Sequence, residues 1–138
     1  KIINLHNKNK PMHIVEDQYG SLTSTYSLSK ACWKIIELFK ENNFEKCDQV
    51  NLLHWSSRGI CNWYEIASAI GDIGFDLNIL NHKSEIIPVK SNHFKSNVKR
   101  PFFSALDCSE SEIILGLKTS PWQEELRQVM HRIFINEK

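Results

Sequence analysis

Tyr26 and Lys30 are a tyrosine and a lysine four residues apart. On a helix this spacing places both side chains one turn apart on the same face. A cation beside a phenol favours the ionised ring oxygen, which proton transfer by tyrosine requires. Lysine is abundant in this chain, so the pair also arises by chance. The alternative is the solvated start of a helix.

Arg100 is the strongest candidate for binding an anion, in the run Lys99-Arg100-Pro101. A guanidinium group matches a diphosphate with two parallel charged hydrogen bonds, which lysine cannot reproduce. The alternative is a surface arginine paired with a carboxylate. The sequence therefore marks Arg100 as a candidate ligand of a nucleotide diphosphate.

A loop rich in hydroxyl and acidic residues forms the second candidate group, with Asp17, Gln18, Ser21 and Thr23. These side chains predict a polar wall near a nucleotide or a sugar. The alternative is turn chemistry, because Asp, Ser and Thr stabilise loops by hydrogen bonding to backbone amides. For Ser21 and Thr23 the turn interpretation is favoured.

Two tryptophans and one histidine have competing interpretations. Trp63 could stack on a base, but its place in an apolar helical pattern favours core packing. Trp122 follows the same pattern. His54 ends an apolar run and is interpreted as a structural histidine with satisfied hydrogen bonds.

Periodicity and turn residues predict the elements that position these residues. They are a polar helix end over 1–10, strands over 12–15, 50–55 and 86–89, helices over about 28–41, 62–73 and 109–115, a loop over 90–99, and a last helix opened by Pro121. Ser27 or Ser29 is the expected cap of the second helix, and Asn62 with Glu65 forms a capping box for the third.

The predicted helices each carry an apolar face. The residues expected to face the core are Leu28, Ala31, Cys32, Ile35, Ile36, Leu38 and Phe39 in one helix, Trp63, Ile66, Ala67 and Ile70 in the next, and Trp122, Leu126, Val129, Met130 and Ile133 in the last. Strands that alternate with helices predict an α/β or mixed α/β fold in one domain. The helix over 28–41 and the strand over 50–55 are expected to pack as a βα layer.

Composition excludes several classes of protein. The net charge is +1, so no global attraction to nucleic acid or to a membrane is expected. The basic residues Lys90, Lys95, Lys99 and Arg100 are too few for a nucleic-acid module. The cysteines form no Cys-x-x-Cys pair and the histidines are dispersed, so no metal site is expected. Cys32 and Cys61 are interpreted as small hydrophobic residues of a reduced, cytoplasmic protein.

Three blocks in order resemble the dTDP-4-dehydrorhamnose reductases of the extended short-chain dehydrogenase/reductase superfamily. The blocks are Asp17-Gln18-Tyr19-Gly20-Ser21-Leu22-Thr23, similar to Asp-Gln-x-Gly-Ser-Pro-Thr; Gly59-Ile60-Cys61-Asn62-Trp63-Tyr64-Glu65, similar to Gly-x-x-Ser-Trp-Tyr-Glu; and Arg100-Pro101-Phe102-Phe103-Ser104-Ala105-Leu106-Asp107, similar to Arg-Pro-x-x-Ser-x-Leu-Asp. Leu22 replaces the usual proline, and Leu53 stands where a tyrosine commonly precedes His54.

The resemblance implies that residues 1–138 are the C-terminal, substrate-binding domain of a Rossmann-type reductase, with the last elements of its sheet. The parent would reduce the 4-keto group of dTDP-4-dehydro-L-rhamnose with NADPH or NADH, and it could form a homodimer. The dTDP-sugar would meet Arg100, Gln18, Asp17, Thr23 and Trp63. The chain begins with Lys1, so we expect it to start inside this longer parent.

The resemblance also implies what this part of the protein lacks. A Gly-x-x-Gly-x-x-Gly phosphate turn is absent, so no cofactor is expected to bind to this fragment alone. The catalytic Tyr-x-x-x-Lys pair is expected upstream of Lys1, and Tyr26 and Lys30 follow the point where it occurs. The fragment is therefore expected to be inactive. The alternative is a non-catalytic regulatory subunit of the same fold, like the beta subunit of methionine adenosyltransferase, and an intact upstream pair would distinguish the reductase.

Overall fold

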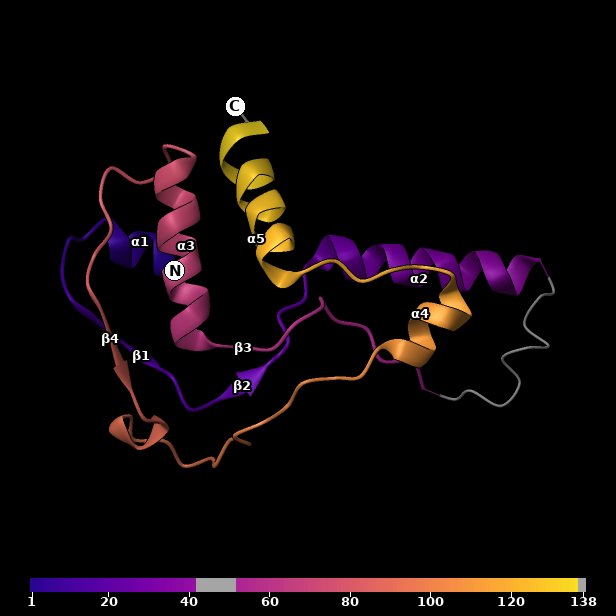
Figure 1. Ribbon diagram of the computed structural model, residues 1–138, viewed down its shortest axis with the longest axis horizontal. Coiled ribbons are helices and arrows are strands. Elements are labelled where there is room, and N and C mark those ends of the chain that lie inside the picture. Colours follow the sequence, from indigo (N-terminus) through magenta and orange to yellow (C-terminus); the bar gives the residue numbers. More distant parts are fainter. Residues whose placement is uncertain (42–51, 137–138) are drawn as a thin grey trace.

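Helices alternate with two small sheets, which confirms the mixed α/β class predicted from the sequence. The computed structural model describes residues 1–41 and 52–136. Its elements are α1 (Ile2–His6), β1 (Met12–Val15), β2 (Tyr19–Gly20), α2 (Thr25–Lys40), β3 (Cys61–Asn62), α3 (Trp63–Asp76), β4 (Ile86–Val89), a 3₁₀ turn (Ser91–His93), α4 (Ser109–Leu115), and α5 (Trp122–His131) with a π-helical end (Arg132–Asn136). Figure 1 shows α1, α3, β1 and β4 on one side and α2 and α4 on the other.

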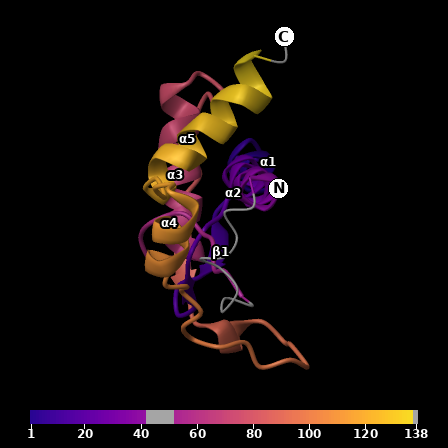
Figure 2. The ribbon, with the colours of Figure 1, turned by 90° about the vertical axis from the view of Figure 1, so that its right-hand side faces the viewer.

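The first sheet is a parallel pair, β1 and β4, in register from Met12 beside Ile86 to Val15 beside Val89. Both strands have the bounds that the sequence predicts. Helix α3 contacts both strands, and α1 and α5 pack against α3. Figures 1 and 2 show the chain after β4 leaving these helices as an extended loop.

Helix α3 begins with the capping box predicted from the sequence. Asn62 Oδ1 accepts from the backbone N–H of Glu65 at 2.8 Å, and Glu65 Oε2 accepts from the N–H of Asn62 at 2.9 Å. Ile66 and Ala67 are buried as expected. The helix continues to Asp76, past the predicted end, because other parts of the chain pack directly on its glycines.

His6, on α1, is fully buried and joins three parts of the chain. Its Nδ1 accepts from the backbone N–H of Ser84 at 3.2 Å, so the proton is assigned to Nε2, which lies 3.3 Å from the carbonyl of Ala67. The Ser84 hydroxyl donates to the His6 carbonyl at 2.8 Å. These bonds hold α1 against α3 and against the turn before β4.

We expect Gly71→Ala to destabilise the chain by about 1–3 kcal/mol, the usual cost of overpacking a core. A Cβ at Gly71 would lie 2.8 Å from His6 Cε1, and the ring is fixed by its two hydrogen bonds. In a His6→Ala background the same change should instead raise stability by about 0.5–1 kcal/mol, because alanine is the better helix former. Urea unfolding of the four proteins measures the difference.

Gly74→Ala is the matched control for this cycle. A Cβ there also lies 2.8 Å from another atom, but that atom is Leu80 Cδ1, the mobile end of a side chain. Gly74→Ala should therefore lose less stability than Gly71→Ala. An equal loss for Gly71→Ala with and without the His6 ring would contradict the close packing as its cause.

Helix α2 begins earlier than predicted. Its N-cap is Ser24, whose hydroxyl accepts from the N–H of Ser27 at 2.9 Å, so the expected caps Ser27 and Ser29 are wrong. Ser27 is instead buried, where its hydroxyl accepts from the Trp55 indole N–H at 3.1 Å. The sequence offers several serines, and only the direction of the incoming chain decides which one caps the helix.

The apolar stripe of α2 is mostly uncovered, contrary to the packing predicted for it. Ala31 is buried, but Leu28, Ile36 and Phe39 are 46%, 41% and 56% exposed, and Cys32 is also exposed. The predicted strand over 50–55 is wrong for residues 52–55, which join no ladder, and 50–51 lie outside the described residues. A strand needs a hydrogen-bonded partner, and the described part of the chain supplies none here.

Helix α5 closes the core over α3. Trp122 is 6% exposed and packs with Cys61 and Ile66, as predicted for the tryptophan, and burial raises the pKa of the Cys61 thiol. Pro121 is the N-cap and Trp122 the first helical residue, one position later than predicted. Ile133 was expected to face inward but is 50% exposed, because the chain turns π-helical after His131. No helix in the described ranges is long and apolar enough to cross a membrane.

Candidate functional site

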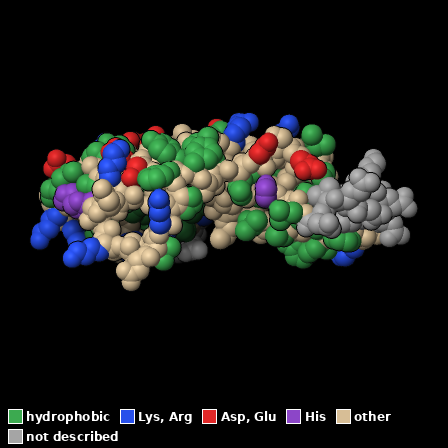
Figure 3. Space-filling view, turned by 90° about the horizontal axis from the view of Figure 1, so that it is seen from below, with side chains coloured by type: hydrophobic (Ala, Val, Ile, Leu, Met, Phe, Trp, Pro, Cys, Tyr) green, Lys and Arg blue, Asp and Glu red, His purple; other side chains and the backbone are tan. Residues whose placement is uncertain are grey.

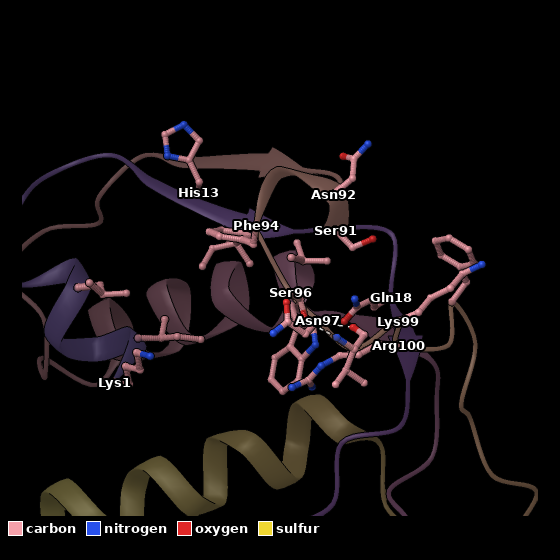
Figure 4. Close-up of a pocket in the computed structure, with 17 residues that line it drawn as sticks. Lys1, His13, Gln18, Ser91, Asn92, Phe94, Ser96, Asn97, Lys99 and Arg100 are labelled. Carbon is pink, nitrogen blue, oxygen red and sulfur yellow. Dashed lines mark hydrogen bonds between the residues drawn. The ribbon is translucent and has the colours of Figure 1, made fainter.

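A cleft of about 940 Å³ lies between α1, β1 and the loop after β4 (Figure 4). A second hollow, of about 580 Å³, adjoins it along β2, β3 and the start of α3. The side chains shared by both walls are Gln18, Trp63, Ser96, Val98 and Arg100. Figure 4 shows Gln18, Ser96, Asn97, Lys99 and Arg100 close together in the cleft, on segments that are far apart in sequence. The site is thus one continuous depression.

The charge of this depression is positive. Lys1, Lys99 and Arg100 line the cleft, and its lining residues and those of the second hollow include no Asp or Glu. Seen from below, most Lys and Arg side chains on this face gather at the end that holds β1, β4 and the loop after β4 (Figure 3). Such a surface attracts an anion.

Arg100 is exposed and forms no ion pair or hydrogen bond with any described residue. The alternative of a surface arginine paired with a carboxylate is therefore not what the structure shows. Other exposed cations of the chain do have such partners; Arg127, for example, lies 2.8 Å from Asp76 Oδ2. The guanidinium of Arg100 is free to bind a ligand in either hollow.

Trp63 is 47% exposed, so its predicted place in the core is wrong. It is the first residue of α3, and it lies on both walls of the depression. Phe94 and Phe102, which are 47% and 57% exposed, line the same cleft. Aromatic faces beside cations suit a ligand that joins a flat base to a phosphate group.

The residues of the first loop separate into distinct roles. Gln18 lines both hollows and Ser21 lines the second. Asp17 is absent from both linings and binds Ser91, a residue of the cleft wall, and Thr23 is exposed and also absent from both linings. The predicted polar wall therefore reduces to Gln18 and Ser21.

Tyr26 and Lys30 lie outside both hollows. Lys30 Nζ lies 5.0 Å from the centre of the Tyr26 ring, and the guanidinium carbon of Arg132 lies 3.8 Å from it. The Tyr26 ring therefore contacts two cations, Lys30 of α2 and Arg132 after α5, and it lines neither hollow. Tyr26 is 45% exposed, which agrees with the alternative of a solvated helix start.

Some site residues were not predicted. Phe94 lies inside the basic loop and Phe102 just after it, and their alternation with Lys95, Lys99 and Arg100 was the available signal. His54 is exposed, so its interpretation as a structural histidine is wrong; His6 has that role instead. Among residues 1–41 and 52–136, no cluster of His, Cys, Asp and Glu could hold a metal ion.

Comparison with known proteins identifies the domain. Residues 1–135 match the family model of the RmlD substrate binding domain. The spore coat polysaccharide biosynthesis protein SpsK of Bacillus subtilis is 28% identical over 129 residues, which cover 94% of this chain and 40% of SpsK. A dTDP-4-dehydrorhamnose reductase of Clostridium acetobutylicum superposes with a TM-score of 0.73 at 28% identity, over 96% of this chain and 42% of that one.

The reductase of Bacillus anthracis, solved in complex with NADP, gives a TM-score of 0.71 at 25% identity, over 99% of this chain and 42% of that one. The chain thus spans about two fifths of the length of these relatives. The resemblance seen in the three sequence blocks is confirmed along nearly the whole chain. With the match over residues 1–135, the chain belongs to the RmlD substrate-binding domain family.

Proposed function

We propose that this chain is the dTDP-sugar-binding part of an NAD(P)H-dependent dTDP-4-dehydrorhamnose reductase, which forms dTDP-L-rhamnose from the 4-keto sugar. The observation that carries the proposal is a cleft with cations, aromatic rings and no lining acid, in a domain of this family. Arg100 and Lys99 would bind the diphosphate, and Trp63 would stack on the base. Gln18 would hydrogen bond to the sugar side of the ligand.

The described residues do not fit a nicotinamide cofactor. A pyrophosphate site needs glycine amides that a ligand can approach at the start of a helix. Gly71 and Gly74 lie inside α3, covered by His6 and Leu80, and Gly59 and Gly116 lie in separate turns. The role of this chain is therefore to bind and orient the sugar nucleotide, and the cofactor would be bound by another part of the parent.

A further part of the proposal is that residues 1–138 combine the substrate-binding domain with the last elements of the parent's Rossmann sheet. Residues 52–57 form no ladder. The Trp55 indole N–H connects them to α2 by its hydrogen bond to the Ser27 hydroxyl. Beside them, the apolar face of α2 is open at Leu28 and Trp33. An upstream strand and its helices would satisfy this backbone and cover this face. We also propose a cytoplasmic location, as for other enzymes of soluble nucleotide sugars, and a parent able to form a homodimer.

The experiment is to incubate the chain with NADPH and dTDP-4-dehydrorhamnose and to follow nicotinamide absorbance, with calorimetry of each ligand. We expect no turnover, binding of dTDP, and no binding of NADPH. Steady turnover that Tyr26→Phe abolishes would contradict the fragment interpretation. Binding of NADPH without binding of dTDP would contradict the substrate-binding role.

A further inference from the structure

Asp17 does not line the cleft, but its carboxylate is engaged by Ser91, a residue of the cleft wall. Its Oδ1 and Oδ2 accept from the backbone N–H of Ser91 at 2.9 and 3.1 Å, and Oδ2 also accepts from the Ser91 hydroxyl at 3.1 Å. We propose that Asp17 is a positioning residue, which fixes the start of the loop over 91–104 and so holds Arg100 at the cleft. The nature of the ligand that Arg100 binds rests on the proposed function. The attachment of the loop by Asp17 rests on the geometry alone.

The loop has little other support. Every residue from Asn92 to Ser104 is exposed. Within the described part of the chain, the hydrogen bonds of residues 92–101 stay inside the loop or return to Lys90 and Ser91. One further contact is the stacking of His93 on His13, with ring centres 5.2 Å apart. A loop of this kind takes its position from its two ends.

Both ends are attached to the same short segment, residues 16–20. At the start, the Asp17 clamp stands beside an ion pair of Lys90 with Glu16 at 3.1 Å, which raises the pKa of Lys90. At the far end, the N–H of Tyr19 donates to the Phe102 carbonyl at 2.8 Å, and the N–H of Ser104 donates to the Tyr19 carbonyl at 2.9 Å. Gln18, between these attachments, faces both hollows. The segment that presents Gln18 thus also sets the position of Arg100.

A carboxylate suits this position for two reasons. It accepts from both donors of Ser91 at once, and charged acceptors form the stronger hydrogen bonds. Its oxygens are also occupied by Ser91, and Asp17 itself is not a lining residue, so a ligand in the cleft does not meet a bare carboxylate. Asparagine has one acceptor oxygen and no charge, so Asp17→Asn weakens the clamp without changing its shape.

The first test measures the clamp without any ligand, by amide exchange on the 138-residue chain. Asp17→Asn is compared with Ser91→Pro, which removes the N–H and the hydroxyl together. Lys90 has φ −73° and ψ 154°, which a following proline accepts, and Ser91 opens a 3₁₀ turn where its N–H is not needed. Exchange at the His93 and Phe94 amides, at the base of the loop, should become roughly tenfold faster in both variants.

Asp107→Asn is the matched control. Asp107 Oδ1 also accepts from the N–H and hydroxyl of a serine, Ser109, at 2.9 and 2.6 Å, but it lies away from the cleft. Asp107→Asn should leave amide exchange at His93 and Phe94 unchanged. Unchanged exchange at His93 and Phe94 in both Asp17→Asn and Ser91→Pro would overturn the proposal.

The second test compares dTDP with thymidine by calorimetry. If Asp17 acts through Arg100, Asp17→Asn should weaken dTDP binding roughly tenfold and thymidine binding far less. A purely structural role would weaken both alike, and that result, or unchanged dTDP binding, would overturn the proposal. Failure of the unmodified chain to bind dTDP would instead contradict the proposed function, and amide exchange would still decide on the clamp.

Discussion

Arg100→Ala should weaken binding of a dTDP-sugar about ten- to a hundredfold in the longer protein that we propose, and leave NADPH binding nearly unchanged. A charged hydrogen bond contributes about 1.5–3 kcal/mol, which corresponds to this range of affinity. Arg100 lines both hollows and is not used by any described carboxylate, so its whole charge is available to the ligand. Arg100→Lys should restore only part of the loss, because the forked geometry is gone.

Calorimetry with both ligands measures this effect, and Arg127→Ala is the control. Arg127 is an exposed arginine on α5 whose guanidinium pairs with Asp76, outside the cleft. It should change neither affinity. Equal losses of dTDP-sugar and NADPH binding in Arg100→Ala would indicate misfolding, and no loss of either would leave Arg100 an ordinary surface residue.

Trp122→Ala should destabilise the chain by about 3–5 kcal/mol, a large share of the 5–15 kcal/mol that typical domains have. The indole is 6% exposed and fills the space between Cys61 and Ile66. It also packs on the turn at Gly59, whose φ of +101° disfavours any side chain and whose missing Cβ would lie 3.0 Å from the ring. Removal of the ring leaves a cavity that these rigid neighbours cannot close.

Trp63→Ala is the comparison for this result. Trp63 is 47% exposed, so its loss should change stability by less than about 1 kcal/mol and should instead lower nucleotide affinity. Urea unfolding of both variants measures the contrast, and Trp122→Phe provides a milder change if Trp122→Ala does not fold. Similar losses of stability in Trp63→Ala and Trp122→Ala would show that the two rings have the same role.

The sequence predicted best the features that depend on neighbouring residues. The capping box of Asn62 and Glu65 closes within one turn, and both of its hydrogen bonds are present. The strands over 12–15 and 86–89 and the helix over 109–115 have the predicted bounds. Arg100, Gln18 and Trp63 were also identified as candidates, because their blocks resemble a family that binds sugar nucleotides.

Long-range contacts decided the rest. Asp17 and Gln18 are adjacent, yet one binds Ser91 and the other faces the cleft, which depends on a loop 74 residues away. The pattern of the α2 stripe predicted burial, but burial also requires a partner surface, and the described residues leave Leu28 and Ile36 exposed.

Trp63 and Trp122 show most clearly how far the sequence alone can predict burial. Each begins a helix, and each stands in an apolar pattern, so the local sequence gives both the same expected burial. The sequence by itself determined that α3 and α5 form and, to within one residue, where they begin, because caps and periodicity act over a few residues. Only the tertiary structure decided that Trp122 meets Cys61 and Ile66 while Trp63 meets the cleft, because burial depends on which distant segment covers a helix face.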